Sequence, residues 1–429
     1  MIYVKYLFIS VFSFSCRGIF SFILLIFMLS PGILRAQSIS FGLKSAPPDL
    51  NVSIDGEILE PVSSASGIRN YLIQGEGTLL FSAAGYYSLE YSNGTLPMKN
   101  GLLEIKLENE NGILKHLGEY STGSQPKSAY FSPEGRRLFV PLLDQQGVDV
   151  FSFEQAGARL VYEKRLLVPG GSAVGFVEAM IDEKRRELWI SNMEENKVHL
   201  FNLDTLDYKM SIGTGGVLPK VIIQNPSGDL TFVSNWVSQD ISVFDSETKK
   251  LLRRIPVNGT PRGMTFPPDG GLLFVAIYDR AEVAVVDLKQ NKVVSRFRFF
   301  NGEGAARHVI YRDGKLYVSD MYRGTVDILN ASTGALIISR RIGPNINTIV
   351  LSPDGKFIFA SSRGRNNSED YTKPGPDFGA VYMLNAEDLT LEERVWGRNQ
   401  PTGLAVSPDG KYLVFTDFLD ANLELYSIR

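Results

Sequence analysis

The sequence predicts an all-β protein, a seven-bladed β-propeller preceded by a small β-sandwich domain. The first observation is a hairpin, PTGLAVSPDGKYLVFTDF at residues 401–418, in which two apolar runs flank the turn SPDG. Pro presets φ at the second turn position, Asp suits the third, and Gly accepts a positive φ at the last. The second observation is that this hairpin recurs about every 41–49 residues, a period typical of propeller blades.

The repeat contains four strands. Copies of the turn occur at residues 132–135, 225–228, 267–270, 311–314 and 352–355, and a degraded copy of the hairpin covers 177–192. Further apolar-rich runs follow each hairpin, as in residues 240–261, and polar turns separate them. We expect four antiparallel strands per repeat, first to fourth from the axis outward. Seven hairpins then predict seven blades.

Each repeat follows one order of motifs: x-P-x-G-hydrophobic, SPDG, K-x-hydrophobic, S/T-N/D, V-x-V-hydrophobic-D and T-G-K. This order resembles the YVTN family of β-propeller repeats. That family is known from bacterial and archaeal surface and periplasmic proteins. The resemblance covers residues 112–429. It implies the propeller fold, but it implies little about activity, because propellers include enzymes, ligand binders and interaction platforms.

Residues 1–36 are expected to form a secretory signal peptide. They contain Lys5, Arg17 and Arg35 but no acidic residue, an apolar run at 19–29, and a small residue, Ala36, at the expected cleavage site. An uncleaved membrane anchor is the alternative. Cys16 is the only cysteine and lies inside this leader, so the mature chain is expected to have no disulfide. We expect an exported protein, periplasmic, on the outer surface or secreted, without a membrane span in the mature chain.

Residues 37–110 do not fit the repeat. Alternating apolar residues, paired glycines and Asp55-Gly56 favour a small antiparallel sandwich. The order V-x-I-D-G, A-G-Y-Y, L-x-I-x-L resembles the PEGA-type sandwich found on envelope proteins; a generic β decoration is the alternative. The propeller is expected to occupy residues 111–429. Its last repeat shows only three strands, so we expect strand 113–120 to complete the seventh blade and close the ring.

Because the strands of a blade alternate in direction, successive loops lie at alternate ends of the propeller, and the loops at one end vary in sequence more than those at the other. The SPDG turns and the turns between third and fourth strands lie at one end, whereas the inter-blade loops and the loops between second and third strands lie at the other. The residue after each inter-blade proline, or its aligned equivalent, should face the channel mouth there. These residues are Lys127, Glu178, Lys220, Arg262, Arg307, Asn347 and Thr402.

Other polar and aromatic residues are expected at the same mouth. His308 follows Arg307, and the ends of second strands add Asp320 and Asp417, with Trp236 and Tyr278 beside such ends. Lys and Arg with aromatic neighbours suit an anionic ligand. The insertion at residues 363–379, which begins with Arg363, should project on this face as a binding loop. The alternative is that these residues only cap loops or form solvated surface.

The sequence favours an exported binding propeller without chemistry of its own, which recognises a protein, a glycan or an anionic ligand. It has three histidines, no HExxH, CxxC or GxSxG motif, and no signature of a cofactor or metal site. The formal net charge of −3 argues against nucleic-acid binding. We expect a monomer. Two alternatives stay open: a lactonase that uses His308, Arg307, Arg262 and Glu178, and an accessory subunit of a periplasmic redox enzyme.

Overall fold

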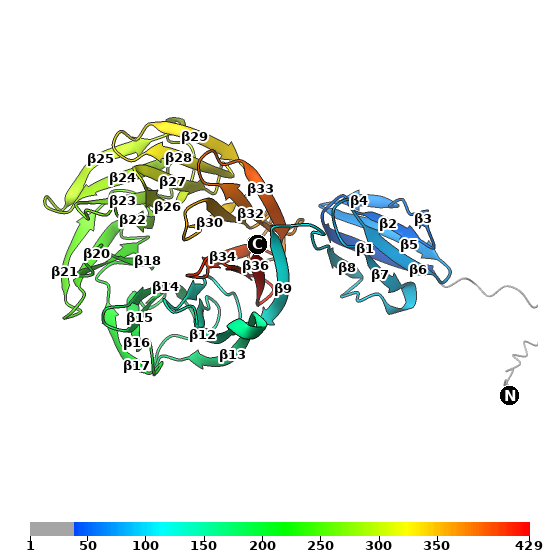
Figure 1. Ribbon diagram of the computed structural model, residues 1–429, viewed down its shortest axis with the longest axis horizontal. Helices are drawn as coiled ribbons and strands as arrows, with labels where there is room; N and C mark the ends of the chain where they lie inside the picture. The colour runs from blue at the N-terminus through cyan, green and yellow to red at the C-terminus, as the bar shows by residue number, and fades with distance from the viewer. Residues whose placement is uncertain (1–37) are drawn as a thin grey trace, which may run out of the picture.

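A computed structural model describes residues 38–429; the expected signal peptide and Cys16 lie outside the described residues. Nine four-stranded sheets form two groups, seven in a closed ring and two in a sandwich beside it (Figure 1). In six of the seven sheets of the ring, the strands follow one another in chain order. In the last sheet, three consecutive strands are followed by β9 (Leu114–Ser121), which comes from before the first blade. The all-β class and the seven-bladed propeller predicted from the sequence are confirmed.

The strands of the first four blades follow the chain. Blade 1 contains β10 (Tyr130–Phe131), β11 (Arg137–Pro141), β12 (Val148–Glu154) and β13 (Arg159–Leu166). Blade 2 contains β14 (Phe176–Asp182), β15 (Glu187–Asn192), β16 (Lys197–Asn202) and β17 (Tyr208–Gly213). Blade 3 contains β18 (Pro219–Gln224), β19 (Leu230–Asn235), β20 (Asp240–Asp245) and β21 (Leu251–Pro256). Blade 4 contains β22 (Pro261–Thr265), β23 (Leu272–Ile277), β24 (Glu282–Asp287) and β25 (Lys292–Arg298).

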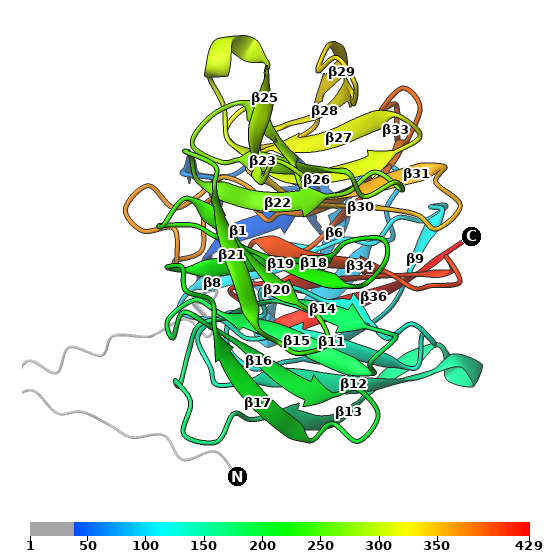
Figure 2. The same cartoon turned by 90° about the vertical axis from the view of Figure 1, so that its left-hand side faces the viewer.

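The remaining blades complete the ring. Blade 5 contains β26 (Ala306–Arg312), β27 (Lys315–Asp320), β28 (Thr325–Asn330) and β29 (Leu336–Arg341). Blade 6 contains β30 (Ile346–Leu351), β31 (Phe357–Ser362), β32 (Ala380–Asn385) and β33 (Leu391–Trp396). Blade 7 contains β34 (Pro401–Val406), β35 (Tyr412–Asp417), β36 (Asn422–Ile428) and, from before blade 1, β9 (Leu114–Ser121). First strands lie nearest the centre of the ring and fourth strands at its rim (Figure 1), and Figure 2 shows the rim from the side of β21.

The sandwich consists of two sheets. One has the order β4 (Ser63–Ala65), β5 (Ile68–Gln74), β1 (Ser38–Ala46) and β8 (Leu102–Lys106). The other has the order β3 (Glu57–Ile58), β2 (Asn51–Ile54), β6 (Thr78–Ser82) and β7 (Leu89–Ser92). Apart from strands, the described residues contain three short 3₁₀ segments, Asn93–Thr95, Gln155–Gly157 and Phe300–Gly302. None of the described residues forms a helix with the length and apolarity needed to span a membrane.

The repeated hairpin forms because its turn residues satisfy the turn backbone locally. In the last copy the Gly410 N–H donates to the Ser407 carbonyl, and the Ser407 hydroxyl accepts from the Tyr412 N–H at 3.0 Å. Gly410 has a φ of 74° and Gly355, at the equivalent position of blade 6, has 72°. Both values lie in the left-handed region, which glycine enters without strain. The turn therefore favours Gly at this position.

Buried apolar side chains join each blade to the next. Seven separate clusters lie between successive blades around the ring. Between blades 2 and 3, for example, Trp189 of β15 packs with Val233 and Phe244. The cluster between blades 6 and 7 includes Leu114 of β9, which pairs with Ile428 of β36. Because β9 covers the outer edge of β36, the start of the propeller holds its end.

The sandwich contacts blades 6 and 7. The Lys106 ammonium lies 2.5 Å from a carboxylate oxygen of the buried Glu424 on β36. Lys44 donates to the Gly375 carbonyl at 3.0 Å, and the Trp396 indole N–H donates to the Tyr86 hydroxyl at 3.3 Å. These contacts set the sandwich beside the propeller rim rather than over the channel.

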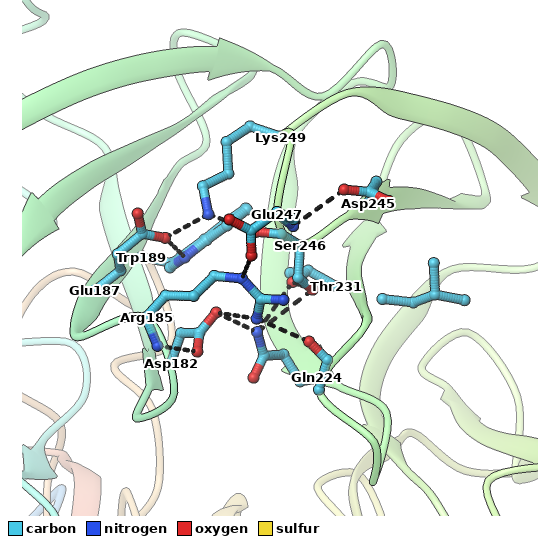
Figure 3. A network of polar contacts seen from close by, with 12 residues as sticks. Asp182, Arg185, Glu187, Trp189, Gln224, Thr231, Asp245, Ser246, Glu247 and Lys249 are labelled. Atoms are coloured by element: carbon cyan, nitrogen blue, oxygen red, sulfur yellow. Dashed lines mark hydrogen bonds and ion pairs between the residues drawn. The ribbon is translucent and has the colours of Figure 1, made fainter.

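At the end of the ring that bears the SPDG turns, which we call the turn face, charged side chains are matched by partners. Figure 3 shows this between blades 2 and 3. Arg185 donates to Asp182 at 3.0 Å and to Glu247 at 2.9 Å, and Lys249 lies 2.6 Å from Glu187. Each cation of this network has a carboxylate, so the network stabilises the packing of two blades without excess charge.

Candidate functional site

The opposite end, which we call the mouth face, is built from bulges in the first strands. The pairing of first with second strand shifts register between Pro219 and Ile222 in blade 3, and between Pro261 and Met264 in blade 4. Equivalent shifts occur in blades 2, 5, 6 and 7. A bulge leaves a residue out of the ladder and redirects its side chain. The residue after each inter-blade proline lies in this bulge, which explains why these side chains share one face.

Hydroxyl groups on the second strands hold the bulges in place. In blade 5 the Ser319 hydroxyl accepts from the His308 N–H at 3.1 Å and donates to the Asn347 carbonyl of blade 6 at 3.1 Å. The same two contacts recur in other blades through Ser191, Ser234, Ser361 and Thr416. Each hydroxyl thus satisfies the bulge of its own blade and fixes the bulge residue of the next, so the mouth residues are positioned by a chain of hydrogen bonds.

The bulge residues surround a cavity of about 300 Å³, the mouth pocket. Five basic residues line it, together with aromatic and sulfur-containing side chains. The lining comprises Lys127, Leu143, Met193, Leu218, Lys220, Trp236, Arg262, Tyr278, Arg307, Met321, Arg363, Tyr371 and Phe418. The three arginines are buried, with exposed fractions of 5–8%. Cations in a concave, poorly hydrated site focus a positive potential on whatever occupies it.

Apolar and aromatic groups separate the cations of the pocket. The Trp236 and Tyr278 rings lie 4.6 Å apart, and the Lys220 ammonium lies 5.7 Å from the Trp236 ring. The Lys127 ammonium lies 4.8 Å from the Phe418 ring, and the Arg363 guanidinium lies 5.5 Å from the same ring. These contacts are cation–π interactions, which hold a cation without neutralising its charge. The positive charges therefore stay available to a ligand.

Sulfur and amide atoms are the other partners of these cations. Lys220 lies 2.8 Å from the Met193 sulfur, Arg307 approaches the Met321 sulfur at 3.9 Å, and Arg363 donates to the Gln400 side-chain oxygen. Among the described residues no carboxylate forms an ion pair with Lys127, Lys220, Arg307 or Arg363. The turn face differs in this respect, because its buried cations have carboxylate partners.

One carboxylate lies at the base of the mouth pocket. Glu178 accepts from Arg262 at 2.6 Å and from the Tyr130 hydroxyl at 2.7 Å. Glu178, Tyr130 and His308 line a second cavity of about 410 Å³, the channel pocket, which continues along the axis among apolar first-strand residues. The ion pair between Glu178 and Arg262 therefore separates the charged mouth pocket from the more apolar channel pocket.

Burial and mutual repulsion lower the pKa values of the basic residues. Burial, then the charges of Arg262 and Arg307, lowers the pKa of Lys220 to about 7, and burial followed by the nearby guanidinium groups lowers that of Lys127 well below its usual range. Burial also lowers the pKa of Arg307 to about 9. The cations thus repel one another, and a bound anion would relieve this repulsion.

Glu178 and His308 also have shifted pKa values, with different causes. Burial works to raise the pKa of Glu178, but Arg262 and the hydrogen bond from Tyr130 outweigh it, so this pKa lies below its ordinary value. Burial lowers the pKa of His308 to about 4. At neutral pH the site therefore contains an ionised Glu178 and a neutral His308.

The inserted loop at residues 363–379 connects the mouth pocket to the sandwich. Arg363 and Tyr371 line the pocket, and Gln400 bridges them because its amide accepts from Arg363 and donates to the Tyr371 carbonyl at 2.6 Å. Further along the loop, the Gly375 carbonyl accepts from Lys44 of β1, whose ammonium also lies 4.5 Å from the Phe378 ring. One loop thus contacts both the pocket and the second domain.

The structure brings together most of the residues singled out in the sequence. Seven of them line the mouth pocket: Lys127, Lys220, Trp236, Arg262, Tyr278, Arg307 and Arg363. Glu178 and His308 lie one layer deeper, in the channel pocket. Both are the second residue of their bulge, whose N–H donates to a second-strand hydroxyl, so the expectation that Glu178 is the equivalent of Lys220 and faces the mouth is corrected. Sequence reasoning missed Tyr130, Tyr371 and the hydroxyl residues of the second strands. The S/T that precedes N/D in the repeat pattern is the signal for those hydroxyls.

Asp320 and Asp417 do not line the mouth pocket. The Asp320 carboxylate accepts from the Ala305 N–H at 3.0 Å and the Arg323 N–H at 2.8 Å, and Asp417 accepts from the Arg398 N–H at 2.9 Å. Both carboxylates are buried against loop backbone, so they hold the inter-blade loops and do not face a ligand. Their expected place at the mouth is corrected accordingly.

A larger hollow of about 620 Å³ lies at the turn face, between blades 1 and 2. Of its three arginines, Arg136 is exposed and the other two are neutralised: Arg137 lies 3.1 Å from Glu163, and Arg186 lies 2.6 Å from Asp204 and 2.7 Å from Glu134. The smaller mouth pocket, with its excess of positive charge, is therefore the better candidate site.

Comparison with known proteins supports the propeller and identifies a relative. Residues 339–429, which span blades 6 and 7, match the family described as lactonase, 7-bladed beta-propeller. A chain of hydrazine synthase from Kuenenia stuttgartiensis has a similar fold, with a TM-score of 0.59 and 18% identity over 70% of this chain and 95% of that chain. The resemblances to the YVTN repeat and to the PEGA-type sandwich stay predictions.

A sequence relative extends over most of the chain. Antigen Lp49 of Leptospira interrogans serogroup Icterohaemorrhagiae serovar copenhageni (strain Fiocruz L1-130) is 35% identical over 337 residues, which cover 75% of this chain and 71% of that protein. The protein described here, a seven-bladed β-propeller, therefore belongs to the same family as antigen Lp49.

Proposed function

We propose that this protein is a binding propeller that recognises an anionic ligand in the mouth pocket. The observation that carries the proposal is the excess of cations: five basic residues line the pocket, and Glu178 is the one carboxylate paired with any of them among the described residues. Buried like charges without counter-ions reduce the stability of the fold. A role in ligand binding explains why such an arrangement is present, whereas a purely structural role does not.

The test is a thermal-shift and calorimetric titration with inorganic phosphate and sulfate. We expect both anions to raise the melting temperature and Arg307→Gln to weaken this effect at least tenfold. Lys356→Gln, which removes an exposed lysine at the turn face, is the matched control and should change nothing. Equal responses of the two variants would show that the anions bind elsewhere on the surface.

Location outside the cytoplasm is part of the proposal. The leader features of residues 1–36 support export, and the name of the relative, antigen Lp49, is consistent with an accessible location for that protein. Protease treatment of intact cells tests this. Digestion by protease added to intact cells, or after the outer layer of the envelope alone is permeabilised, is the expected result; protection that ends only when the cytoplasm is released would contradict it.

Hydrolysis of a sugar lactone is the second candidate, favoured by the family match over blades 6 and 7. The chemistry of the site argues for binding instead. Glu178 is held by Arg262 and Tyr130, and the pKa of His308 is lowered to about 4, so both are weak bases at neutral pH. A pH-stat assay with glucono-δ-lactone distinguishes the two. Proton release that Glu178→Gln abolishes would establish catalysis in place of simple binding.

A further inference from the structure

The basic residues of the mouth pocket form two sets, which we call arms. The first arm comprises Lys127 of blade 1 and Arg363 of blade 6, both of which lie against the Phe418 ring of blade 7. The second arm comprises Lys220, Arg262 and Arg307, which come from the bulges of three successive blades, 3, 4 and 5. In a closed ring of seven blades, blade 4 lies across the axis from the junction of blades 7 and 1. The two arms therefore face each other across the mouth.

Each arm has a net charge of about two when all its basic groups are protonated, as a bound anion favours. The first arm has two cations and no carboxylate partner among the described residues. The second arm has three cations, and the ion pair between Glu178 and Arg262 offsets one of them. A single compact anion placed at one arm would leave the other arm unneutralised, so the electrostatic match requires two separate negative groups.

The space between the arms is suited to a small organic body. Trp236, Tyr278, Met193 and Met321 line the pocket beside the second arm, and Phe418 lies beside the first. A volume of about 300 Å³ is at the lower end of the range for small-molecule sites. The pocket therefore accommodates a molecule of modest size and not a folded domain.

We propose that the ligand is a small molecule with two separated anionic groups, phosphate or carboxylate, one bound by Lys127 and Arg363 and the other by Lys220 and Arg307, with its carbon body against Trp236, Tyr278 and Phe418. This inference rests on the proposed anion-binding function and specifies its ligand. Arg262 shares its guanidinium between Glu178 and the second anionic group, since one of its terminal nitrogens lacks a hydrogen-bond partner in the structure.

Proton uptake should accompany binding. Burial, followed by the nearby charges of Arg262 and Arg307, lowers the pKa of Lys220 to about 7; Glu178 and Glu194 act in the opposite direction. A bound dianion favours the ammonium form and raises that pKa. Binding measured at pH 7 in buffers of different ionisation enthalpy should therefore report a net uptake of protons.

The experiment is isothermal titration of the full chain with matched probes: fructose 1,6-bisphosphate against fructose 6-phosphate, and adipate against hexanoate. Three proteins are compared: the natural chain, a first-arm variant, Lys127→Met with Arg363→Met, and a second-arm variant, Lys220→Met with Arg307→Met. We expect at least one two-charge probe to bind the natural chain tenfold or more tightly than its single-charge partner, and each arm variant to abolish that advantage. Melting temperatures of the two variants show that both are folded, and removal of unpaired buried cations should not lower them.

Three results would overturn the inference in different ways. In the first, single-charge and two-charge probes bind with equal affinity, and only one arm variant weakens their binding. This would show an anion site at one arm only and would leave the proposed function intact. Absence of binding by all four probes and by inorganic phosphate would reject both proposals. Binding of an acidic peptide in place of every small probe, reduced by the arm variants, would assign the mouth to a protein partner and would also reject the small-molecule ligand.

Discussion

The Arg262 guanidinium lies 2.6 Å from the Glu178 carboxylate, so a residue of blade 4 reaches past blade 3 to a residue of blade 2. Among the described residues, this is the one ion pair that involves a basic residue of the mouth pocket. It links non-adjacent blades and forms the boundary between the mouth pocket and the channel pocket. Its two members therefore affect both stability and ligand affinity, in opposite directions.

Glu178→Gln is expected to lower stability and raise anion affinity. The change leaves Arg262 buried without a counter-ion, which should cost about 3 kcal/mol, near the lower end for a broken buried pair because Gln still accepts from Tyr130. The freed Arg262 should bind anions more tightly. Chemical denaturation and phosphate titration measure the two effects. A variant with unchanged stability and affinity would contradict the assigned role of the pair.

The pH dependence of this effect follows from the pKa of Glu178. Because the folded pKa lies below the ordinary value of 4.5, the pair stabilises the fold fully above that pH and loses its contribution as pH falls through the folded pKa. The stability difference between the natural chain and Glu178→Gln should therefore be largest at pH 7 and shrink below about pH 4.5. A difference that is the same at pH 7 and pH 3 would contradict this.

Lys220→Met is expected to stabilise the empty protein at low pH. The pKa of Lys220 is lowered to about 7 from 10.5, so the charged form destabilises the fold below pH 7, and this cost disappears as pH rises from about 7 to 10.5. The variant should gain about 1 kcal/mol or more at pH 6 and little at pH 10. Lys220→Arg, which stays charged, is the control and should show no gain. Thermal melts at the two pH values provide the measurement.

Gly410→Val should destabilise the last blade by about 1–3 kcal/mol. Gly410 has a φ of 74°, and an added Cβ would lie 3.6 Å from Pro353, which is an ordinary contact. The cost therefore comes from the backbone and not from a clash. Gly410→Asn, which tolerates this backbone region, should cost much less. Equal losses for Val and Asn in denaturant unfolding would point to a different cause.

Deletion of residues 112–120 should reduce cooperative stability more than deletion of the sandwich, residues 38–108. The first deletion removes most of β9 and exposes the edge of β36, including the pairing of Leu114 with Ile428. The second removes contacts such as Lys106 with Glu424 but leaves the ring closed. Calorimetric melting compares the two. A propeller that melts at its normal temperature without residues 112–120 would show that β9 does not hold the ring.

Several features were accessible from the sequence because their causes are local. The SPDG turn is specified by its own four residues, and its recurrence counts the blades. The convergence of Lys220, Arg262 and Arg307 was predictable because all three occupy the same point of the repeat, where the first strand bulges; Lys220 and Arg262 follow a proline there, and Arg307 follows Ala306. Because the repeats share one local structure, the position of one bulge residue in its repeat predicts the position of the equivalent side chains around the ring.

Other features depend on contacts that repetition does not specify. Asp320 lies at the end of a second strand, as the sequence indicated, but its carboxylate turns to the N–H groups of Ala305 and Arg323. Whether such a residue faces the axis or holds a loop depends on the unpaired donors nearby. Tyr371 reaches the pocket from an irregular loop, and Tyr130 reaches Glu178 from the neighbouring blade. Neither follows from the periodicity.

The central claim is that the mouth pocket binds anions, and crystals soaked in selenate test it most directly, because selenate is a compact dianion with an anomalous signal. We expect anomalous peaks within hydrogen-bond distance of Arg307 and of Lys127, one at each arm, and their loss in the corresponding arm variants. Selenate bound only at exposed lysines of the turn face, with an empty mouth pocket, would contradict the claim.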